Sequence, residues 1–237
     1  MHRTTCLARY PERMRDVSHD FYLYERPLWE DGHIVVGVDE VGRGALAGPL
    51  TVGAVVLSSE RPIPDFLDDS KRLSSRRREQ LAPHIELWSD DHGHGSASAY
   101  EIDHYGLMDA LTLATHRALA KLTLRPTHVL LDGTVDFFSR GTRLDLLDTS
   151  PTAHLRDLSV TTIIGGDAKS AVIAAASVLA KVHRDQIMTE MAPRFAAYGW
   201  AQNKGYGTSR HLDALREYGP SLEHRTSWRL PRKIAES

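Results

Sequence analysis

Four acidic residues each stand where an apolar, strand-like run of the chain ends. They are Asp39 and Glu40 after residues 34–38, Asp132 after residues 128–131, and Asp167 after residues 160–164. Open α/β sheets place their ligand sites at such strand ends. Crowded carboxylates raise one another's pKa unless cations neutralise them, and hard oxygen ligands at neutral pH suit Mg²⁺ or Mn²⁺. Each acid alone has a structural explanation as a turn residue or helix cap, but together the four indicate a divalent-metal site.

A glycine-rich turn, Gly42-Arg43-Gly44-Ala45-Leu46-Ala47-Gly48, follows the first two acids. Its glycines partly match the dinucleotide-binding fingerprint, which requires a helix directly after them. Pro49 and the β-type run 51–57 follow instead, so we reject that interpretation. The turn can still bring backbone amides close to a ligand, next to one guanidinium. Such a turn suits a hydroxyl or a phosphate group.

The elements that must position these residues are strands first, and then strands alternating with helices. The pattern predicts strands at residues 34–38, 50–57, 96–100, 128–131 and 160–164, a helix that ends near residue 87 after the basic run 71–78, and helices over residues 101–121, 168–188 and from Thr208 to residue 219. A short link joins the first two strands, so we expect a hairpin. The apolar helix at 168–188 is expected to pack closely on the sheet. This order predicts a mixed-sheet α/β core with helical additions.

The composition is that of an ordinary globular protein. The 237 residues carry 29 Lys and Arg against 31 Asp and Glu, a net charge of −2, and 41% of residues are hydrophobic. These values exclude a disordered or collagen-like chain. Because no bulk positive charge marks a nucleic-acid binder, any such function must come from a local site. The longest uncharged apolar run, residues 171–180, is about half the ~20 residues that a membrane span needs.

The cysteine count and the N-terminal sequence bear on location. Cys6 is the single cysteine and cannot form an internal disulfide, and the N-terminus lacks the apolar run of a secretory signal. A reducing cytoplasm is therefore expected. We divide the chain into an N-terminal arm (1–32), a catalytic core (33–190) and a C-terminal helical segment (191–237).

A series of short motifs, in the same order and at compatible spacing, resembles the bacterial ribonuclease HII family. The motifs are Gly37-Val38-Asp39-Glu40-Val41-Gly42-Arg43-Gly44 with Leu46-Ala47-Gly48-Pro49, Asp69-Ser70-Lys71-Arg72-Leu73, Tyr100-Glu101-Ile102-Asp103, Leu131-Asp132-Gly133, Gly166-Asp167-Ala168-Lys169-Ser170, Ala174-Ala175-Ala176-Ser177, Ala180-Lys181-Val182 with Arg184-Asp185, Asn203-Lys204-Gly205-Tyr206-Gly207-Thr208 and His224-Arg225. The resemblance covers roughly residues 34–229. So many motifs together are far more specific than any single one.

The resemblance implies an α/β fold of the ribonuclease H type, a mixed five-stranded sheet flanked by helices with a C-terminal helical extension that covers the substrate. It implies a metal-dependent endoribonuclease that hydrolyses the RNA strand of RNA/DNA hybrids and cuts 5′ to single ribonucleotides in duplex DNA, leaving a 5′-phosphate and a 3′-hydroxyl. The family's metal-binding carboxylates fall on Asp39, Glu40, Asp132 and Asp167. Two divalent ions, Mg²⁺ or Mn²⁺, would activate a water for in-line attack and stabilise the departing oxygen.

The resemblance also assigns substrate contacts. The turn Gly42, Arg43 and Gly44 would read the ribose 2′-hydroxyl, the group that separates RNA from DNA, and Tyr206 would stack on the deoxyribose just past the junction. Secondary binders of the nucleic-acid backbone would be Lys71, Lys169, Ser170 and Lys181. The expected partners are RNA/DNA hybrid and ribonucleotide-containing duplex DNA, and we expect a monomer that does not bind membranes. The family admits a sliding clamp as a partner, but no motif here points to one.

Three other charged groups receive structural interpretations. If one helix runs on from Ala168, Asp185 lies about 27 Å from Asp167 at 1.5 Å per residue, so both cannot ligate one metal pair. The group Asp90, Asp91, His92 and His94 suggests zinc, but it lies in a Gly-flanked loop with no cysteine near. The run Arg76-Arg77-Arg78 is interpreted as a solvated helix face.

Two alternatives to a ribonuclease HII stay open. One is another nuclease of the ribonuclease H fold, such as a junction resolvase or a ribonuclease HIII; the latter would need a separate N-terminal substrate-binding domain, for which the arm is too short. The other is a catalytically silent protein that binds hybrids. The presence of all four carboxylates argues against it.

Overall fold

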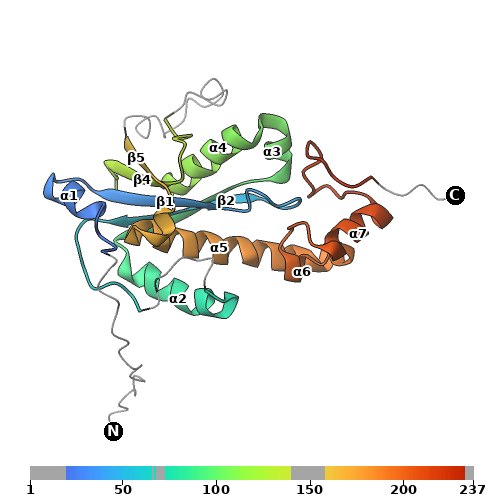
Figure 1. Ribbon diagram of the computed structural model, residues 1–237, viewed down its shortest axis with the longest axis horizontal. Coiled ribbons are helices and arrows are strands. Elements are labelled where there is room, and N and C mark those ends of the chain that lie inside the picture. Colours follow the sequence, from blue (N-terminus) through green and yellow to red (C-terminus); the bar gives the residue numbers. More distant parts are fainter. Residues whose placement is uncertain (1–19, 66, 68–72, 140–157, 233–237) are drawn as a thin grey trace, which may run out of the picture.

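The computed structural model describes residues 20–65, 67, 73–139 and 158–232. In chain order (Figure 1) its elements are α1 Glu25–Glu30, β1 Val35–Val41, β2 Leu50–Leu57, α2 Ser75–Trp88, β3 Asp91–Ala97, α3 Ala99–Tyr105, α4 Leu107–Leu119, β4 His128–Asp132, β5 Ser159–Ile163, the 3-10 helix η3 Gly166–Ala168, α5 Ala171–Met191, the 3-10 helix η4 Ala192–Tyr198, α6 Trp200–Asn203 and α7 Ser209–Tyr218. Most predicted elements are present with shifted ends, and Thr208 is the N-cap of α7 as expected.

The five strands form one mixed sheet in the order β3-β2-β1-β4-β5. β1 pairs antiparallel with β2, and β2 with β3, which confirms the predicted hairpin. β1, β4 and β5 run parallel to one another. The carboxyl ends of these three strands therefore lie at the same edge of the sheet, where a ligand site is expected.

Helices cover both faces of the sheet (Figure 1). One face packs on α5 and α2, and the other on α4 and α3. Helix α5 approaches very closely because glycines face it: a Cβ on Gly37 would lie 2.3 Å from the backbone carbon of Val172, and a Cβ on Gly53 would lie 2.3 Å from the carbonyl oxygen of Ala176. This contact fixes α5 against the strand that carries Asp39.

Strand β3 lies where the sequence predicts a loop, and residues 99–105 are helical where it predicts the end of a strand at 96–100. Two residues of β3 are glycines because α4 leaves no room for side chains. A Cβ on Gly95 would lie 2.2 Å from the carbonyl oxygen of Ala114, and one on Gly93 is similarly blocked. The apolar alternation that usually marks a strand is therefore missing.

Two predicted helices begin or break at other positions than expected. The helix predicted at 101–121 is divided into α3 and α4 at Gly106, whose φ of +85° suits glycine. The helix predicted from residue 168 starts at Ala171, because Ser170 is its N-cap and accepts a hydrogen bond from the N–H of Ile173.

The sequence pattern predicts no element in residues 20–32, whereas the structure has α1 there. Tyr22 is buried in the same apolar cluster as α5. The indole N–H of Trp29 donates to the carbonyl of Leu57 at 3.0 Å. This part of the chain therefore packs on the α/β core.

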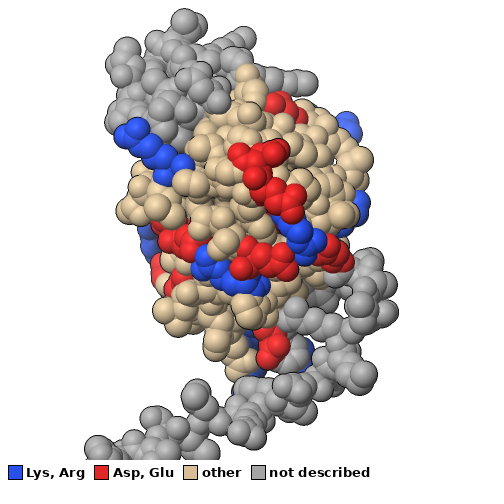
Figure 2. Space-filling model, turned by 90° about the vertical axis from the view of Figure 1, so that its left-hand side faces the viewer, with Lys and Arg blue, Asp and Glu red and all other residues tan. Residues whose placement is uncertain are grey.

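Acidic and basic residues are interspersed on the face around α1 (Figure 2). Arg26 forms ion pairs with Asp20 and Glu60, and Arg61 forms one with Asp90. Among the described residues of this face, these basic side chains are therefore each balanced by an acidic neighbour.

The C-terminal helices surround a third apolar cluster. Trp200 is fully buried there and packs with Tyr198, Leu215 and Met188. The cluster joins the end of α5 to α6 and α7. None of the helices in the described ranges is long and apolar enough to cross a membrane.

Candidate active site

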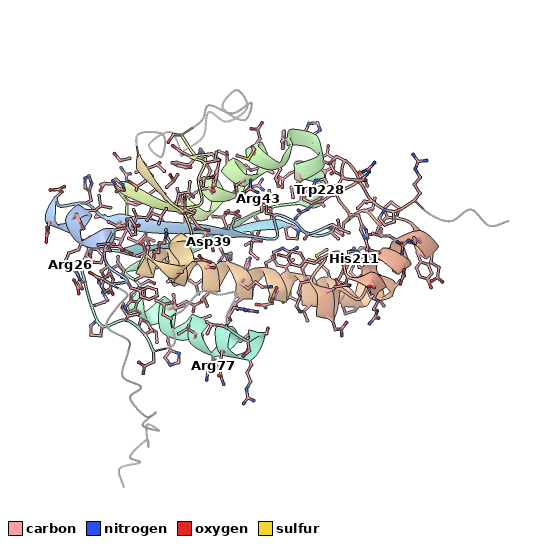
Figure 3. The ribbon with its side chains drawn as sticks, viewed as in Figure 1. Arg26, Asp39, Arg43, Arg77, His211 and Trp228 are labelled. Carbon is pink, nitrogen blue, oxygen red and sulfur yellow. The ribbon has the colours of Figure 1, made fainter. Side chains whose placement is uncertain are left out.

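The carboxyl ends of the parallel strands bring the predicted ligands into one region. We call Asp39, Glu40, Asp132 and Asp167 the strand-end carboxylates. The β1–β4 register pairs Val38 with Leu131, so the next residues, Asp39 and Asp132, are neighbours on the same face of the sheet, about 4.8 Å apart in strand spacing. Asp39 lies between the sheet and α5 (Figure 3).

Asp39 is nearly buried, with 6% of its surface exposed. Burial raises the pKa of Asp39 well above its ordinary value, and the negative charges of Glu40 and Asp132 raise it further. Hydrogen bonds from the Ser177 hydroxyl and from the N–H of Glu40, at 2.8 Å, lower it. A cation at this position would favour the charged carboxylate.

Glu40 lies beside the first basic residue of the glycine turn. Burial raises the pKa of Glu40, the Arg43 guanidinium lowers it, and the charge of Asp132 raises it. The ion pair joins Arg43 Nη1 to Glu40 Oε1 at 3.4 Å, and about half of the Arg43 side chain stays exposed. Arg43 is therefore a counter-charge at the site that still faces solvent.

Asp132 and Asp167 are connected through Gly166. The N–H of Gly166 donates to Asp132 Oδ1 at 2.6 Å. Asp167 follows directly in η3 and is 3% exposed. A Cβ on Gly166 would lie 2.6 Å from Ile173 Cδ1, so a larger residue there would displace the end of the Ile173 side chain.

The donor chemistry of these residues fits a divalent cation. The negative charge of Asp132 contributes to the raised pKa of both Asp39 and Glu40, and carboxylate oxygens suit Mg²⁺ or Mn²⁺. Within the described ranges, however, no group of three His, Cys, Asp or Glu side chains is already arranged as a metal-ligand set. The backbone therefore assembles the donors, while their side chains do not converge in this structure.

The glycine turn and the loop that carries Tyr206 lie against each other. The N–H of Leu46 donates to the carbonyl of Gly205 at 2.8 Å. The ring of Tyr206 lies 5.3 Å from the guanidinium carbon of Arg184. The structure thus brings together two predicted substrate contacts that lie far apart in the sequence.

Two residues in these contacts were not assigned a role from the sequence. Arg184 and Arg225 are fully buried and bind backbone carbonyls around the glycine turn. Both stand in family motifs, and Arg184 is one of two charged residues buried on α5, next to Asp185. Their place in these motifs is the signal that could have identified them.

The predicted backbone binders occupy different environments. Lys169 is exposed and donates to the carbonyl of Ile164 at 2.6 Å. Ser170 is fully buried, and its hydroxyl donates to Glu25 at 2.6 Å. It is also the N-cap of α5, which is a structural role. Lys181 is partly buried and pairs with Asp185. Lys71 lies outside the described residues.

Two acidic groups take the structural positions expected of them. Asp185 lies far along α5 and pairs with Lys181 and, at 4.0 Å, with Arg78. Asp91, from the His-rich segment, accepts hydrogen bonds from the N–H groups of Thr123 and Leu124 at 2.6 and 2.8 Å. Its carboxylate therefore anchors a turn.

Comparison with known proteins identifies the family. The family model described as Ribonuclease HII matches residues 36–230. A ribonuclease HII of Streptomyces coelicolor is 44% identical over 195 residues, which is 82% of this chain and 76% of the relative. One of Burkholderia mallei is 43% identical over 197 residues, which is 83% of this chain and 84% of the relative.

Solved structures share the fold. The ribonuclease HII in a complex with PCNA from Archaeoglobus fulgidus superposes with a TM-score of 0.63 and 25% identity, covering 85% of this chain and 98% of that one. Bst-RNase HIII in complex with Mn²⁺ superposes with a TM-score of 0.57 and 20% identity, over 79% and 63% of the chains. Since the family model matches most of the sequence, the chain belongs to the ribonuclease HII family, the type 2 ribonuclease H endoribonucleases.

Proposed function

We propose that the strand-end carboxylates bind two divalent cations, Mg²⁺ or Mn²⁺, for the hydrolysis of the RNA strand in RNA/DNA hybrids and for cleavage 5′ to a single ribonucleotide in duplex DNA. The observation that carries this proposal is the buried Asp39 beside Asp132, where burial and then the negative charges of Glu40 and Asp132 raise the pKa of Asp39. When bound, such cations activate water for in-line attack and stabilise the departing 3′ oxygen.

The protein's own groups prepare the site for this chemistry. The Ser177 hydroxyl and the N–H of Glu40 orient the Asp39 carboxylate. The N–H of Gly166 orients Asp132. Orientation by neighbouring hydrogen bonds is what tunes ligating carboxylates in metalloenzymes. We expect the four side chains to converge when cations bind.

Substrate selection is proposed for the glycine turn and Tyr206. The backbone of Gly42, Arg43 and Gly44 would meet the ribose 2′-hydroxyl, and Tyr206 would stack on the next deoxyribose. The close contact between the turn and the Tyr206 loop supports this division of roles. The C-terminal segment 191–237 would cover the substrate there.

Contacts to the nucleic-acid backbone are proposed for the remaining basic residues. The exposure of Lys169 supports such a contact most directly. Lys181 and Ser170 would have to leave Asp185 and Glu25 to make one, and Lys71 remains a prediction from its motif. We also expect a cytoplasmic monomer. Because the Archaeoglobus relative was solved in a complex with PCNA, a sliding clamp is the protein partner to test for this chain, although no motif in its sequence points to one.

The decisive experiment is cleavage of a DNA duplex that contains one ribonucleotide. We expect nicking 5′ to the ribonucleotide with Mg²⁺ or Mn²⁺, loss of nicking with a chelator, and no cleavage of an all-DNA duplex. Asp132→Asn should lower the rate at least about 100-fold, because a neutral amide binds a divalent cation poorly. Full activity of Asp132→Asn would remove that residue from the ligand set. Binding of hybrid without any cleavage would favour the silent hybrid-binding alternative.

A further inference from the structure

Two arginines lie beneath the glycine turn without a role in the chemistry described so far. Arg184 on α5 and Arg225 after α7 are both fully buried. Among the residues that the structure describes, neither forms an ion pair; their donors bind backbone carbonyls instead. Two guanidinium groups without carboxylate partners are costly in a protein interior. Their carbonyl contacts therefore require a functional explanation.

Arg225 binds the carbonyls of the turn itself. Its Nη2 donates to the carbonyl of Gly42 at 2.7 Å, and its Nη1 donates to that of Arg43 at 3.0 Å. In a trans peptide the N–H points opposite to the carbonyl of the same unit. Fixing these two carbonyls inward therefore directs the N–H groups of Arg43 and Gly44 outward.

These two outward N–H groups are adjacent and available. Neither donates to any other residue in the described ranges. Open space surrounds Gly44, since a Cβ there would meet nothing within 4 Å. Arg43 and Trp228 lie near the same end of the sheet (Figure 3), and the Trp228 ring packs 4.9 Å from the Arg225 guanidinium carbon. Successive N–H groups of this kind form a site for an oxygen.

Arg184 connects the turn to the loop of Tyr206. It donates to the carbonyl of Ala47 at 3.2 Å and to that of Lys204 at 2.9 Å. It also fills the space beside Gly42, where a Cβ would lie 2.1 Å from its Nε. The guanidinium thus fixes the spacing between the amide donors and the Tyr206 ring.

We propose that Arg225 is a positioning residue for ribose recognition, which orients the Arg43 and Gly44 N–H groups toward the 2′-hydroxyl, while Arg184 sets their distance from Tyr206. This inference rests on the proposed function of the turn. It adds that specificity for the ribose depends on Arg225, which lies some 180 residues from the glycine turn in the sequence and does not itself touch the substrate.

The test is Arg225→Lys, which retains the positive charge but replaces a planar fork with one nitrogen. We expect kcat/KM at a single ribonucleotide to fall about 100-fold, and the half-saturating Mn²⁺ concentration and the Kd for an all-DNA duplex to stay within about twofold of wild type. General damage to the fold would change all three quantities. Arg26→Lys, an exposed arginine of α1 paired with Asp20 and Glu60, is the matched control and should leave them unchanged.

Each outcome decides a separate claim. If the wild-type protein does not distinguish a ribonucleotide from a deoxynucleotide, the proposed function fails. If it does and Arg225→Lys keeps wild-type kcat/KM, the role of Arg225 is wrong. Should the variant show no cooperative unfolding, amide exchange in the wild type decides: the N–H groups of Arg43 and Gly44 must exchange freely and become protected by a one-ribonucleotide duplex but not by all-DNA duplex.

Discussion

Asp39 receives a hydrogen bond from the hydroxyl of Ser177 on α5. Removing that donor raises the pKa of Asp39 further, because burial and the neighbouring acids then act with less opposition. We expect Ser177→Ala to raise the half-saturating concentration of Mg²⁺ or Mn²⁺ about 10-fold. Single-turnover cleavage as a function of metal concentration measures this.

Thr115→Ala provides the control for loss of a buried hydroxyl. Thr115 lies on α4, on the other face of the sheet, and within the described ranges its hydroxyl bonds only to the carbonyl of Leu111, at 2.9 Å. Its replacement should leave the metal requirement unchanged. Equal metal requirements in Ser177→Ala and the wild type would mean that the Ser177 hydroxyl does not support Asp39.

The sequence predicts acidic and polar site residues better than the groups that position them. The strand-end carboxylates could be proposed as ligands because each follows an apolar run, and the parallel register brings Asp39 beside Asp132. Arg184 and Arg225 could not be assigned roles, since their partners are backbone carbonyls of distant turns. Residue types do not reveal where a carbonyl points.

At the scale of elements, the contact between β2 and α5 depends on Gly53. A Cβ there would lie 2.3 Å from the carbonyl oxygen of Ala176, and neither the strand nor the helix backbone can yield easily. We expect Gly53→Ala to lower the free energy of unfolding by about 3 kcal/mol, at the upper end of overpacking effects. Urea denaturation followed by circular dichroism measures the change.

Gly44→Ala is the matched substitution in open space. Nothing lies within 4 Å of a Cβ at Gly44, so the free energy of unfolding should stay within about 0.5 kcal/mol of wild type. A loss in Gly53→Ala no larger than in Gly44→Ala would show that α5 does not pack on β2 as closely as described.

Element prediction failed where tertiary contacts replace the usual pattern. Strand β3 contains Gly93 and Gly95 because α4 approaches its backbone, and of the remaining positions, which are Asp, His, Ser and Ala, only Ala97 is apolar. A period-2 apolar pattern cannot arise in such a strand. In contrast, β2 is buried on both faces and reads as a continuous apolar run.

For the whole molecule, buried histidines make the stability of the fold depend on pH. His211 Nδ1 lies 2.9 Å from the carbonyl of Tyr206 and must donate to it. Its Nε2 therefore accepts from the indole of Trp200 and from His224 Nε2. The Nδ1 of His224 accepts from the N–H of Ser221. The single lone pair of His211 Nε2 is shared between these two donors, so a proton added there would remove the acceptor of the Trp200 indole.

We expect the protein to lose stability as the pH falls below 6.5. Burial and then the charge of His211 lower the pKa of His224 to about 4, and burial and then His183 do the same for His94. The unfolded chain binds these protons near pH 6.5, whereas the folded protein does not until about pH 4. Protons therefore favour the unfolded chain between these values, and each of the two histidines should lower the free energy of unfolding by at most about 2 kcal/mol between pH 7.5 and pH 5. Urea unfolding at both pH values measures this difference.

The variant His94→Asn should reduce the difference in stability between the two pH values, and His84→Gln, on the exposed face of α2, should not. An unchanged difference in His94→Asn would exclude a contribution from the His94–His183 contact.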